Sequence, residues 1–286
     1  MTNFDDIKIF IGPMSINIVD CIIEVCEENN VRIGLIPSRR QIEYTAGYVN
    51  NWSTNSFSEY VKNKSSKVVL QRDHGGRQQG TEDYYESFKT DVNSGFDLIH
   101  IDPWKKFVNI DEVVSETIEN INFCYQINQN TCYEIGTEQA IHEYSYSQLD
   151  YFLTQIKNEL SQSVWNQVKY AVIQAGTRIS GTKNMGVFDV ERCKNMVNVC
   201  HKHGLLSKEH NGDYLSNEAV SLRFNSGLDA INIAPEFGVL ETNTILNHLS
   251  EEQIDKFYKT CYESNKWVKW VPDDFNPHEN KRAIVS

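Results

Sequence analysis

The sequence predicts a single-domain α/β protein with the (β/α)8 architecture of a TIM barrel. Short apolar runs recur eight times along the 286 residues, and longer segments with helical spacing of apolar residues separate them. No linker rich in Pro, Gly or Ser divides the chain. Alternating strands and helices indicate a parallel sheet, and eight such units favour closure into a barrel. An open doubly wound sheet is the alternative, but the glycines form no dinucleotide or P-loop fingerprint.

Each expected strand is a short apolar run bounded by glycine, proline or polar residues. In chain order the runs are 7–11, 32–36, 67–70, 97–101, 133–135, 170–173, 205–208 and 229–233. Between them, apolar residues recur at i, i+3 and i+4, as in 19–26 and 113–121, which indicates amphipathic helices. We assign residues 1–250 to the barrel and expect residues 251–286 to form a C-terminal helix and a tail that pack on the barrel.

Charge and composition exclude several classes of function. The formal net charge is −12 and no basic stripe is present, which argues against binding to nucleic acid. No apolar run reaches the roughly 20 residues that span a bilayer, and the first residues are acidic rather than basic as in a signal peptide. Seven cysteines without a Cys-x-x-Cys pair are typical of reduced thiols. We therefore expect a cytoplasmic protein that does not associate with membranes.

Polar residues follow the expected strands, where barrel enzymes carry their chemistry. In strand order they are Ser38, Arg39 and Arg40; Asp73, His74 and Arg77; His100 and Asp102; Glu138; Gln174 and Arg178; Glu209, His210 and Asp213; and Asn232 and Glu236. Histidines and carboxylates from neighbouring strand ends are suited to binding one divalent ion. Each histidine taken singly also fits a hydrogen-bonded structural role. The arginines fit either an anion clamp or neutralisation of an acidic rim.

Several of these motifs resemble a known family. The chain resembles the barrel of tagatose-bisphosphate aldolase Z-type (non-catalytic) subunits in four motifs that occur in the same order. They are Asp-His at 73–74, His-x-Asp at 100–102, Gly-Thr-Glu at 136–138 and Glu-His-x-x-Asp-Tyr at 209–214. Segments 37–48, 173–176 and 230–234 extend the resemblance, which runs from about residue 8 to 245. More distantly, the chain is similar to class II fructose-bisphosphate aldolases.

The resemblance implies specific roles for the strand-end residues. Asp73 would exchange a proton with a substrate hydroxyl, and Glu138 would serve both catalysis and the metal. His74 and His210, with Glu138, would hold a divalent ion, expected to be Zn²⁺ with Mn²⁺ or Mg²⁺ as alternatives. Gln174 stands where class II aldolases carry a further metal-binding histidine. The residues expected to bind substrate are Arg40, Arg77, His100, Asp102, Gln174, Arg178 and Asn232.

These roles imply a metal-dependent enzyme of aldolase type that acts on a ketose or ketose phosphate. It would cleave the C3–C4 bond by a retro-aldol reaction or epimerise C4. The alternatives are a non-catalytic stabilising subunit of a class II tagatose-bisphosphate aldolase, or a barrel enzyme for a carboxylated or nucleotide-linked sugar. We expect a homo-oligomer, with a catalytic aldolase subunit as a further possible partner. Phosphate recognition is open, because Glu236 adds negative charge after the eighth strand.

Overall fold

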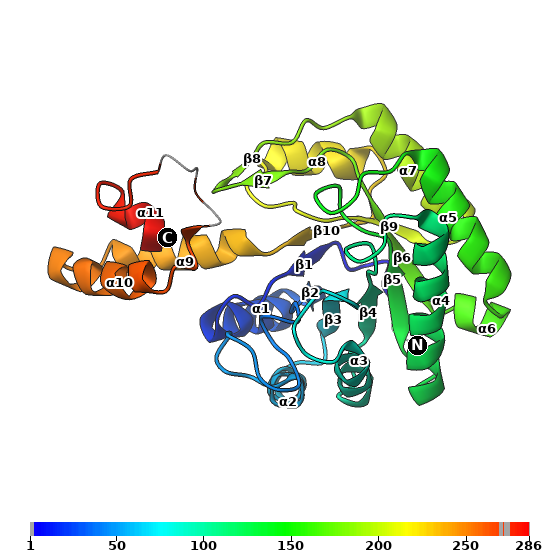
Figure 1. The fold of residues 1–286 in the computed structure, drawn as a ribbon, viewed down its shortest axis with the longest axis horizontal. Helices are drawn as coiled ribbons and strands as arrows, with labels where there is room; N and C mark the ends of the chain where they lie inside the picture. The colour runs from blue at the N-terminus through cyan, green and yellow to red at the C-terminus, as the bar shows by residue number, and fades with distance from the viewer. Residues whose placement is uncertain (1–2, 269–270, 272–274, 286) are drawn as a thin grey trace.

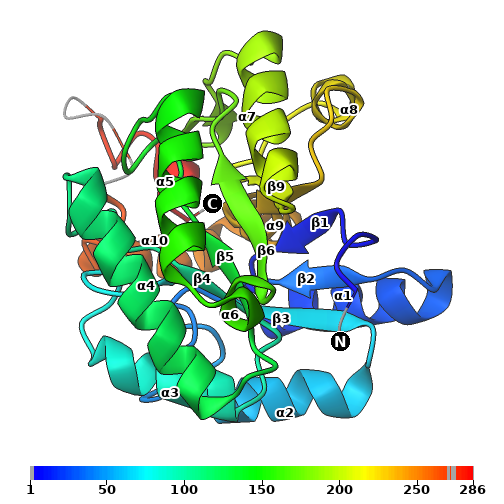
Figure 2. The ribbon, with the colours of Figure 1, turned by 90° about the vertical axis from the view of Figure 1, so that its right-hand side faces the viewer.

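Eight parallel strands close into a barrel with helices outside, as the sequence predicts (Figures 1 and 2). The computed structural model describes residues 3–268, 271 and 275–285. The barrel order is β1-β10-β9-β6-β5-β4-β3-β2, so each strand neighbours the next barrel strand in the chain and β10 closes on β1. The barrel strands are β1 (Ile9–Ile11), β2 (Ile33–Leu35), β3 (Val68–Gly75), β4 (Leu98–Ile101), β5 (Cys132–Ile135), β6 (Val168–Ile173), β9 (Leu206–Glu209) and β10 (Ala230–Ile233).

Helices connect the strands and cover the outside of the barrel. They are α1 (Ile16–Asn29), α2 (Thr54–Lys64), α3 (Tyr84–Asn93), α4 (Ile110–Ile127), α5 (Tyr146–Glu159), α6 (Gln162–Trp165), α7 (Val190–Lys202), α8 (Asn217–Asn225) and α9 (Pro235–Leu246). Ser, Asp or Asn side chains cap the N-termini of α1 to α5, α7 and α8, where they accept hydrogen bonds from first-turn amides. The apolar faces of α1 to α5 and α7 pack against the sheet and bury the main core. The helix after the last strand, α9, instead projects from the barrel (Figure 1) and buries only Leu246. None of the described helices is long and apolar enough to cross a membrane.

The interior of the barrel is apolar at its N-terminal end and polar at its C-terminal end. Phe10 and Tyr170 meet edge to face at the apolar end, where Phe4 also packs on Tyr170. Gly34 leaves space for the Phe10 side chain, because a Cβ at position 34 would lie 1.9 Å from the Phe10 ring. Val69 and Cys132 belong to the same apolar cluster. Two residues after them along β3 and β5 come the buried polar side chains of Gln71 and Glu134. The strand period of two therefore directs these polar groups towards the mouth.

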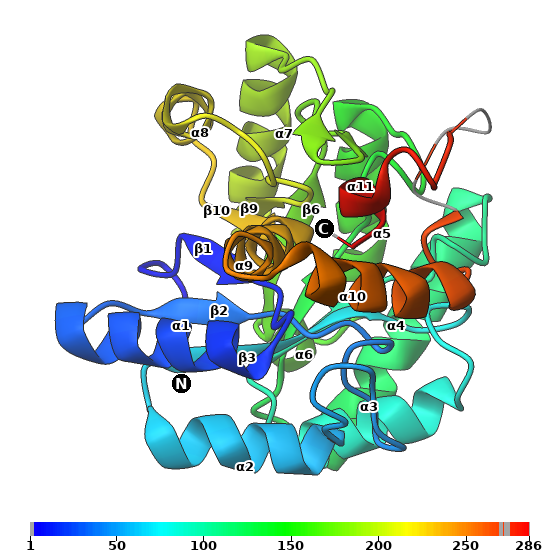
Figure 3. The same ribbon diagram turned by 90° about the vertical axis from the view of Figure 1, so that its left-hand side faces the viewer.

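Two additions extend the barrel. A short antiparallel hairpin, β7 (Ile179–Ser180) and β8 (Lys183–Asn184), follows β6 at the mouth. After α9 come α10 (Glu251–Glu263) and α11 (Lys281–Val285), which pack on each other around a small apolar cluster separate from the barrel core (Figure 3). The predicted division of the chain near residue 250 stays a prediction.

Each of the eight predicted apolar runs overlaps a barrel strand, but one local expectation was wrong. β3 runs on to Gly75, so Asp73 and His74 belong to the strand and do not follow it. All seven cysteines are free.

Candidate active site

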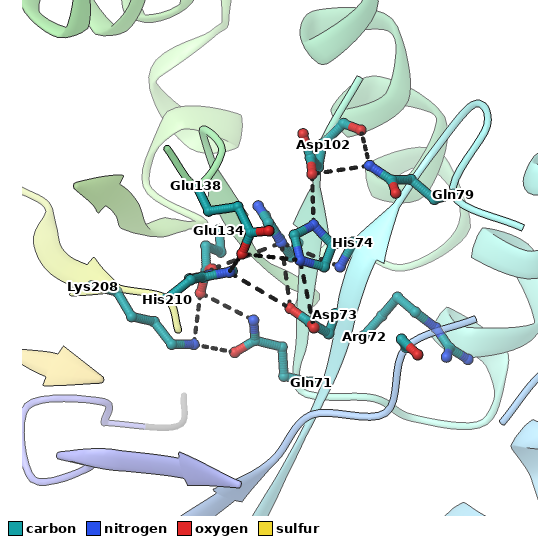
Figure 4. Close-up of polar contacts among 12 residues, drawn as sticks. Gln71, Arg72, Asp73, His74, Gln79, Asp102, Glu134, Glu138, Lys208 and His210 are labelled. Carbon is teal, nitrogen blue, oxygen red and sulfur yellow. Dashed lines mark hydrogen bonds and ion pairs between the residues drawn. The ribbon is translucent and has the colours of Figure 1, made fainter. Parts of the chain in front are cut away.

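A β-bulge at the end of β3 turns two consecutive side chains towards the barrel mouth. The register against β4 shifts between Arg72 and Gly75, which places one extra residue in β3. His74 has φ 47°, a left-handed conformation that is rare for a residue with a side chain. In a regular strand, successive side chains face opposite sides of the sheet. The bulge instead lets both Asp73 and His74 face the site (Figure 4).

A buried ion pair outside the barrel fixes the strand at this bulge. The Arg72 guanidinium donates to the Asp91 carboxylate of α3, with Nε–Oδ2 at 2.7 Å and Nη2–Oδ1 at 2.6 Å. It also donates to the carbonyl oxygens of Pro37 and Ile42 at 3.0 and 2.7 Å. Both charged side chains are fully buried. Arg72 therefore ties β3, α3 and the loop after β2 together immediately beside Asp73.

Hydrogen bonds fix the ring of His74 and its proton. Nδ1–H donates to Asp102 Oδ2 at 2.6 Å, and Gln79 Nε2 donates to the same oxygen at 3.0 Å. Because a carboxylate only accepts, the Nδ1 atom carries the proton. The other ring nitrogen, Nε2, then faces Asp73 Oδ2 at 3.7 Å and Glu138 Oε2 at 3.8 Å. Asp102, predicted to bind substrate, here orients His74.

His210 is oriented in the same way from the opposite side of the barrel. Its Nε2–H donates to Glu134 Oε1 at 2.6 Å. The other oxygen of Glu134 accepts from Lys208 Nζ at 2.7 Å and from Gln71 Nε2 at 3.0 Å. These bonds leave His210 Nδ1 facing Glu138 Oε2 at 3.9 Å and Asp73 Oδ1 at 4.0 Å. The predicted metal set, His74, Glu138 and His210, thus has its ligand atoms within 4.8 Å of one another.

His100 lies between these two histidines and is fully buried. Its Nε2–H donates to the Gly136 carbonyl at 3.0 Å, and its Nδ1 accepts from the His74 backbone N–H at 3.2 Å. Its ring centroid is 5.1 Å from that of His74 and 4.9 Å from that of His210. Both nitrogens are therefore used within the protein. Its predicted contact with substrate stays a prediction.

Asp73 and Asn232 are among the residues whose buried polar atoms lack a hydrogen-bond partner in the described part of the chain. In Asp73 the atom is Oδ1, which is buried although it belongs to a side chain that is 13% exposed. In the carboxamide of Asn232 on β10, both Oδ1 and Nδ2 are buried and unpaired. Buried polar groups are rarely left without a partner, so each is suited to contact a ligand. Asp73 and Asn232 are also predicted site residues.

The other predicted substrate residues lie in different surroundings. Gln174 is buried and donates to the carbonyls of Thr137 and His142, while its Oε1 accepts from the Tyr144 N–H. Arg77 pairs with Glu116 of α4 at 2.6 Å, away from the histidines. Arg40 and Arg178 are exposed. A role in substrate binding stays a prediction for each of them, and for Gln174 it would require exchange of existing bonds.

The network of Gln71, Glu134 and Lys208 was not anticipated from the sequence. All three side chains are fully buried within the barrel, and Lys208 Nζ also lies 3.4 Å from the centre of the Phe10 ring. The predicted site residues were expected to follow the strands, whereas Gln71, Glu134 and Lys208 lie inside β3, β5 and β9. A usable signal existed: Lys208 precedes His210 by two residues, and Gln71 precedes Asp73 by two, so each pair shares the inward face.

Negative charge dominates the centre of the site. The site contains four carboxylates, those of Asp73, Asp102, Glu134 and Glu138, and one ammonium, that of Lys208. With neutral imidazoles the site would therefore carry an excess of three negative charges. Burial disfavours the charged form of His74, yet Asp73, Asp102 and Glu138 raise its pKa well above the ordinary value. Burial likewise would raise the pKa of Asp73, but the surrounding imidazoles outweigh it and lower that pKa. The site is therefore arranged to hold positive charge, with Asp73 ionised.

The pKa of Asp213, three residues after His210, should make the free energy of unfolding depend on pH. Burial raises its pKa to about 6, although the amides of Glu236 and Ala234 donate to it and oppose the shift. Since the pKa is higher in the folded chain than in the unfolded one, this group stabilises the fold below pH 4 and loses that contribution as pH rises to about 6. Relative to Asp213→Asn, the wild-type free energy of unfolding should fall by about 3 kcal/mol over this range. Urea unfolding of both proteins at several pH values measures the difference, and a constant difference would contradict the assignment.

The chain is similar in fold to several solved structures. No family model matches the chain, and no curated protein matches it. Among solved structures, a probable tagatose 6 phosphate kinase from Sinorhizobium meliloti 1021 superposes with a TM-score of 0.77 at 13% identity, covering 97% of this chain and 80% of that one. The chain shares its fold.

Two aldolases have the same barrel. The YdjI aldolase from Escherichia coli K12 gives a TM-score of 0.61 at 14% identity, covering 99% of this chain and 87% of its own. The fructose-bisphosphate aldolase from Campylobacter jejuni gives 0.60 at 11% identity, covering 98% and 86%. These likenesses confirm the predicted (β/α)8 fold. At such low identity they do not extend to the Z-type subunits or to an activity.

Proposed function

We propose that the chain is a metal-dependent enzyme of aldolase type that acts on a ketose or ketose phosphate, by retro-aldol cleavage of C3–C4 or by epimerisation at C4. The observation that carries this proposal is the convergence of His74 Nε2, Glu138 Oε2 and His210 Nδ1 beside a buried, unpaired oxygen of Asp73. The fold shared with two aldolases supports it.

The residues present fit a divalent ion. For ligands at metal distances near 2.1 Å in tetrahedral geometry, ligand atoms lie about 3.4 Å apart. The observed separations of 3.8 and 3.9 Å are slightly wider. Each histidine donates its other N–H to a carboxylate, which is the usual support for a metal-binding imidazole. The excess of carboxylates favours a dication, and two nitrogens with one oxygen are a donor set typical of Zn²⁺.

The chain's own residues account for the remaining requirements of the reaction. When bound, the ion would stabilise the negative charge that develops on the ketose oxygens. Asp73, ionised at neutral pH, would take the C4 hydroxyl proton as the C3–C4 bond breaks and return it in the reverse direction. Asn232 would donate and accept hydrogen bonds at the substrate oxygens. Asp102 and Glu134 would hold the imidazoles still while the proton moves.

The direct test is turnover of the full-length chain with and without metal. Protein treated with EDTA and then reloaded with Zn²⁺ is incubated with a panel of ketohexoses and their phosphates, and NMR follows both fragments and C4 epimers. We expect turnover in the reloaded sample and loss of at least about 90% of it with excess chelator, because charge on the fragment would lack its counter-charge. Undiminished turnover in chelator would contradict metal dependence. No turnover of any ketose would favour a non-catalytic role.

Asp102→Asn tests the support of the metal site apart from activity. An asparagine amide at this position can donate to His74 Nδ1 and move the ring proton to Nε2, the atom proposed to bind metal. We expect the affinity for Zn²⁺, measured by competition with a fluorescent chelator, to fall by about 10- to 100-fold. Glu59→Gln, at an exposed position of α2, is the control and should leave the affinity unchanged. Equal affinity in Asp102→Asn and wild type would remove His74 from the proposed metal set.

A further inference from the structure

The start of α9 adjoins the candidate site at the barrel mouth. Asn232 lies on β10, Ala234 follows that strand, and α9 begins at Pro235. In many (β/α)8 barrels a phosphate binds here, between the loops after the last two strands and a helix N-terminus, because the helix presents free N–H groups and a partial positive charge. Whether these N–H groups are free to bind an anion therefore indicates whether the substrate carries a phosphate at the end that lies near α9.

In this chain the carboxylate of Asp213 accepts hydrogen bonds from the amides at the start of α9. Asp213 Oδ1 accepts from the N–H of Ala234 and from that of Glu236, both at 2.9 Å. Pro235, between them, has no N–H. In return, Glu236 Oε2 accepts from the Tyr214 N–H at 2.7 Å. The loop after β9 and the helix start thus bind each other, with two negative charges where an anionic group would sit.

Packing around the first turn of α9 leaves little room for such a group. A Cβ on Gly238 would lie 3.0 Å from the Cβ of Met14, so the Met14 side chain already covers the helix backbone there. A Cβ on Gly12 would lie 2.7 Å from the Cβ of Ala234, which shows the loop after β1 pressed against the loop after β10. Asp213 itself is 1% exposed. A phosphate could enter only by displacing this carboxylate.

We propose that Asp213 and Glu236 are specificity residues that exclude phosphate from the start of α9, so that the substrate places a neutral, hydroxyl-bearing end there. The inference rests on the proposed aldolase chemistry and narrows its substrate to an unphosphorylated ketose at this end. Two carboxylates repel a phosphate dianion and accept hydrogen bonds from hydroxyl groups. Isolated ketone fragments of the two kinds, dihydroxyacetone and dihydroxyacetone phosphate, are suitable probes.

The first measurement tests exclusion without any reaction. Backbone amide resonances of Glu236, Phe237 and Gly238 are followed by NMR in the full-length chain during titration with inorganic phosphate. We expect no shift in the wild type. In Asp213→Asn/Glu236→Gln, the neutral carboxamides accept hydrogen bonds more weakly than carboxylates and do not repel an anion, so phosphate can displace them and should bind at least about tenfold more tightly. Glu59→Gln is the charge control. Phosphate-dependent shifts of these amides in the wild type would overturn the proposal.

The second measurement uses exchange of methylene hydrogen for deuterium in D₂O, with the Zn²⁺-loaded protein. In this step a C–H bond beside the ketone breaks, its proton passes to solvent, and a deuteron forms the new C–D bond. We expect exchange of dihydroxyacetone to be at least about tenfold faster than that of dihydroxyacetone phosphate, and the double variant to lose this preference. Equal or faster exchange of the phosphate would overturn the inference. Absence of exchange with both probes would contradict the proposed function, whereas the amide shifts would still decide whether phosphate is excluded.

Discussion

Asp73→Asn should lower kcat/KM for the ketose substrate by about 10³-fold, the range expected for loss of a general acid–base group. Asparagine has nearly the same shape but cannot accept the hydroxyl proton. Asp73 is not among the three proposed metal ligands, and its Oδ1 makes no hydrogen bond within the described chain. The variant should therefore fold and bind Zn²⁺ as the wild type does.

Steady-state kinetics, thermal unfolding and metal content together check this result. Glu59→Gln, at an exposed position of α2, serves as the matched control and should retain full activity. A decrease of less than about tenfold in Asp73→Asn would show that another group moves the proton. Loss of metal together with activity would instead move Asp73 into the metal set.

Lys208→Met should destabilise the fold by about 3–5 kcal/mol, because it leaves the buried carboxylate of Glu134 without its counter-charge. Methionine can still pack on the Phe10 ring, whose centre lies 3.4 Å from the Lys208 ammonium nitrogen. Glu134 and Lys208 are both fully buried, so solvent cannot replace the missing charge. The free energy of unfolding in urea measures the effect.

Two further variants separate charge from packing. Lys208→Met/Glu134→Gln removes both charges, while the carboxamide oxygen introduced by the second substitution can still accept from His210, so this double variant should recover at least about half of the loss. Lys256→Met breaks the exposed pair with Glu252, whose side chains are 74% and 78% exposed, and should cost at most about 0.5 kcal/mol. A loss below about 1 kcal/mol in Lys208→Met would contradict the buried pairing.

The barrel was predictable because its signals are local. Each strand includes a short apolar run, and α1 to α5 and α7 carry their own amphipathic patterns and N-caps, so neither requires knowledge of distant contacts. The bulge in β3 was not predictable in this way. It depends on an extra residue relative to β4 and on the left-handed backbone of His74, and the sequence shows only a run of four polar residues, 71–74, before Gly75.

The candidate site was predictable in part, for a related physical reason. Asp73, His74, Glu138 and His210 sit near strand ends, and closure of the barrel brings such ends together whatever the side-chain partners are. Partners across the barrel are a different matter. Glu134 holds His210 from another strand 76 positions earlier, and Gln174 faces backbone carbonyls of the loop after β5. Such pairings follow from the tertiary arrangement and leave no pattern along the chain.

The central claim is that His74, Glu138 and His210 form a metal centre beside Asp73. Crystals of the full-length chain grown with Zn²⁺ and measured at the zinc absorption edge test it most directly. The predicted result is one strong anomalous peak within about 2.0–2.2 Å of His74 Nε2, His210 Nδ1 and a Glu138 oxygen. A fully loaded crystal with no peak among these three side chains would contradict the claim.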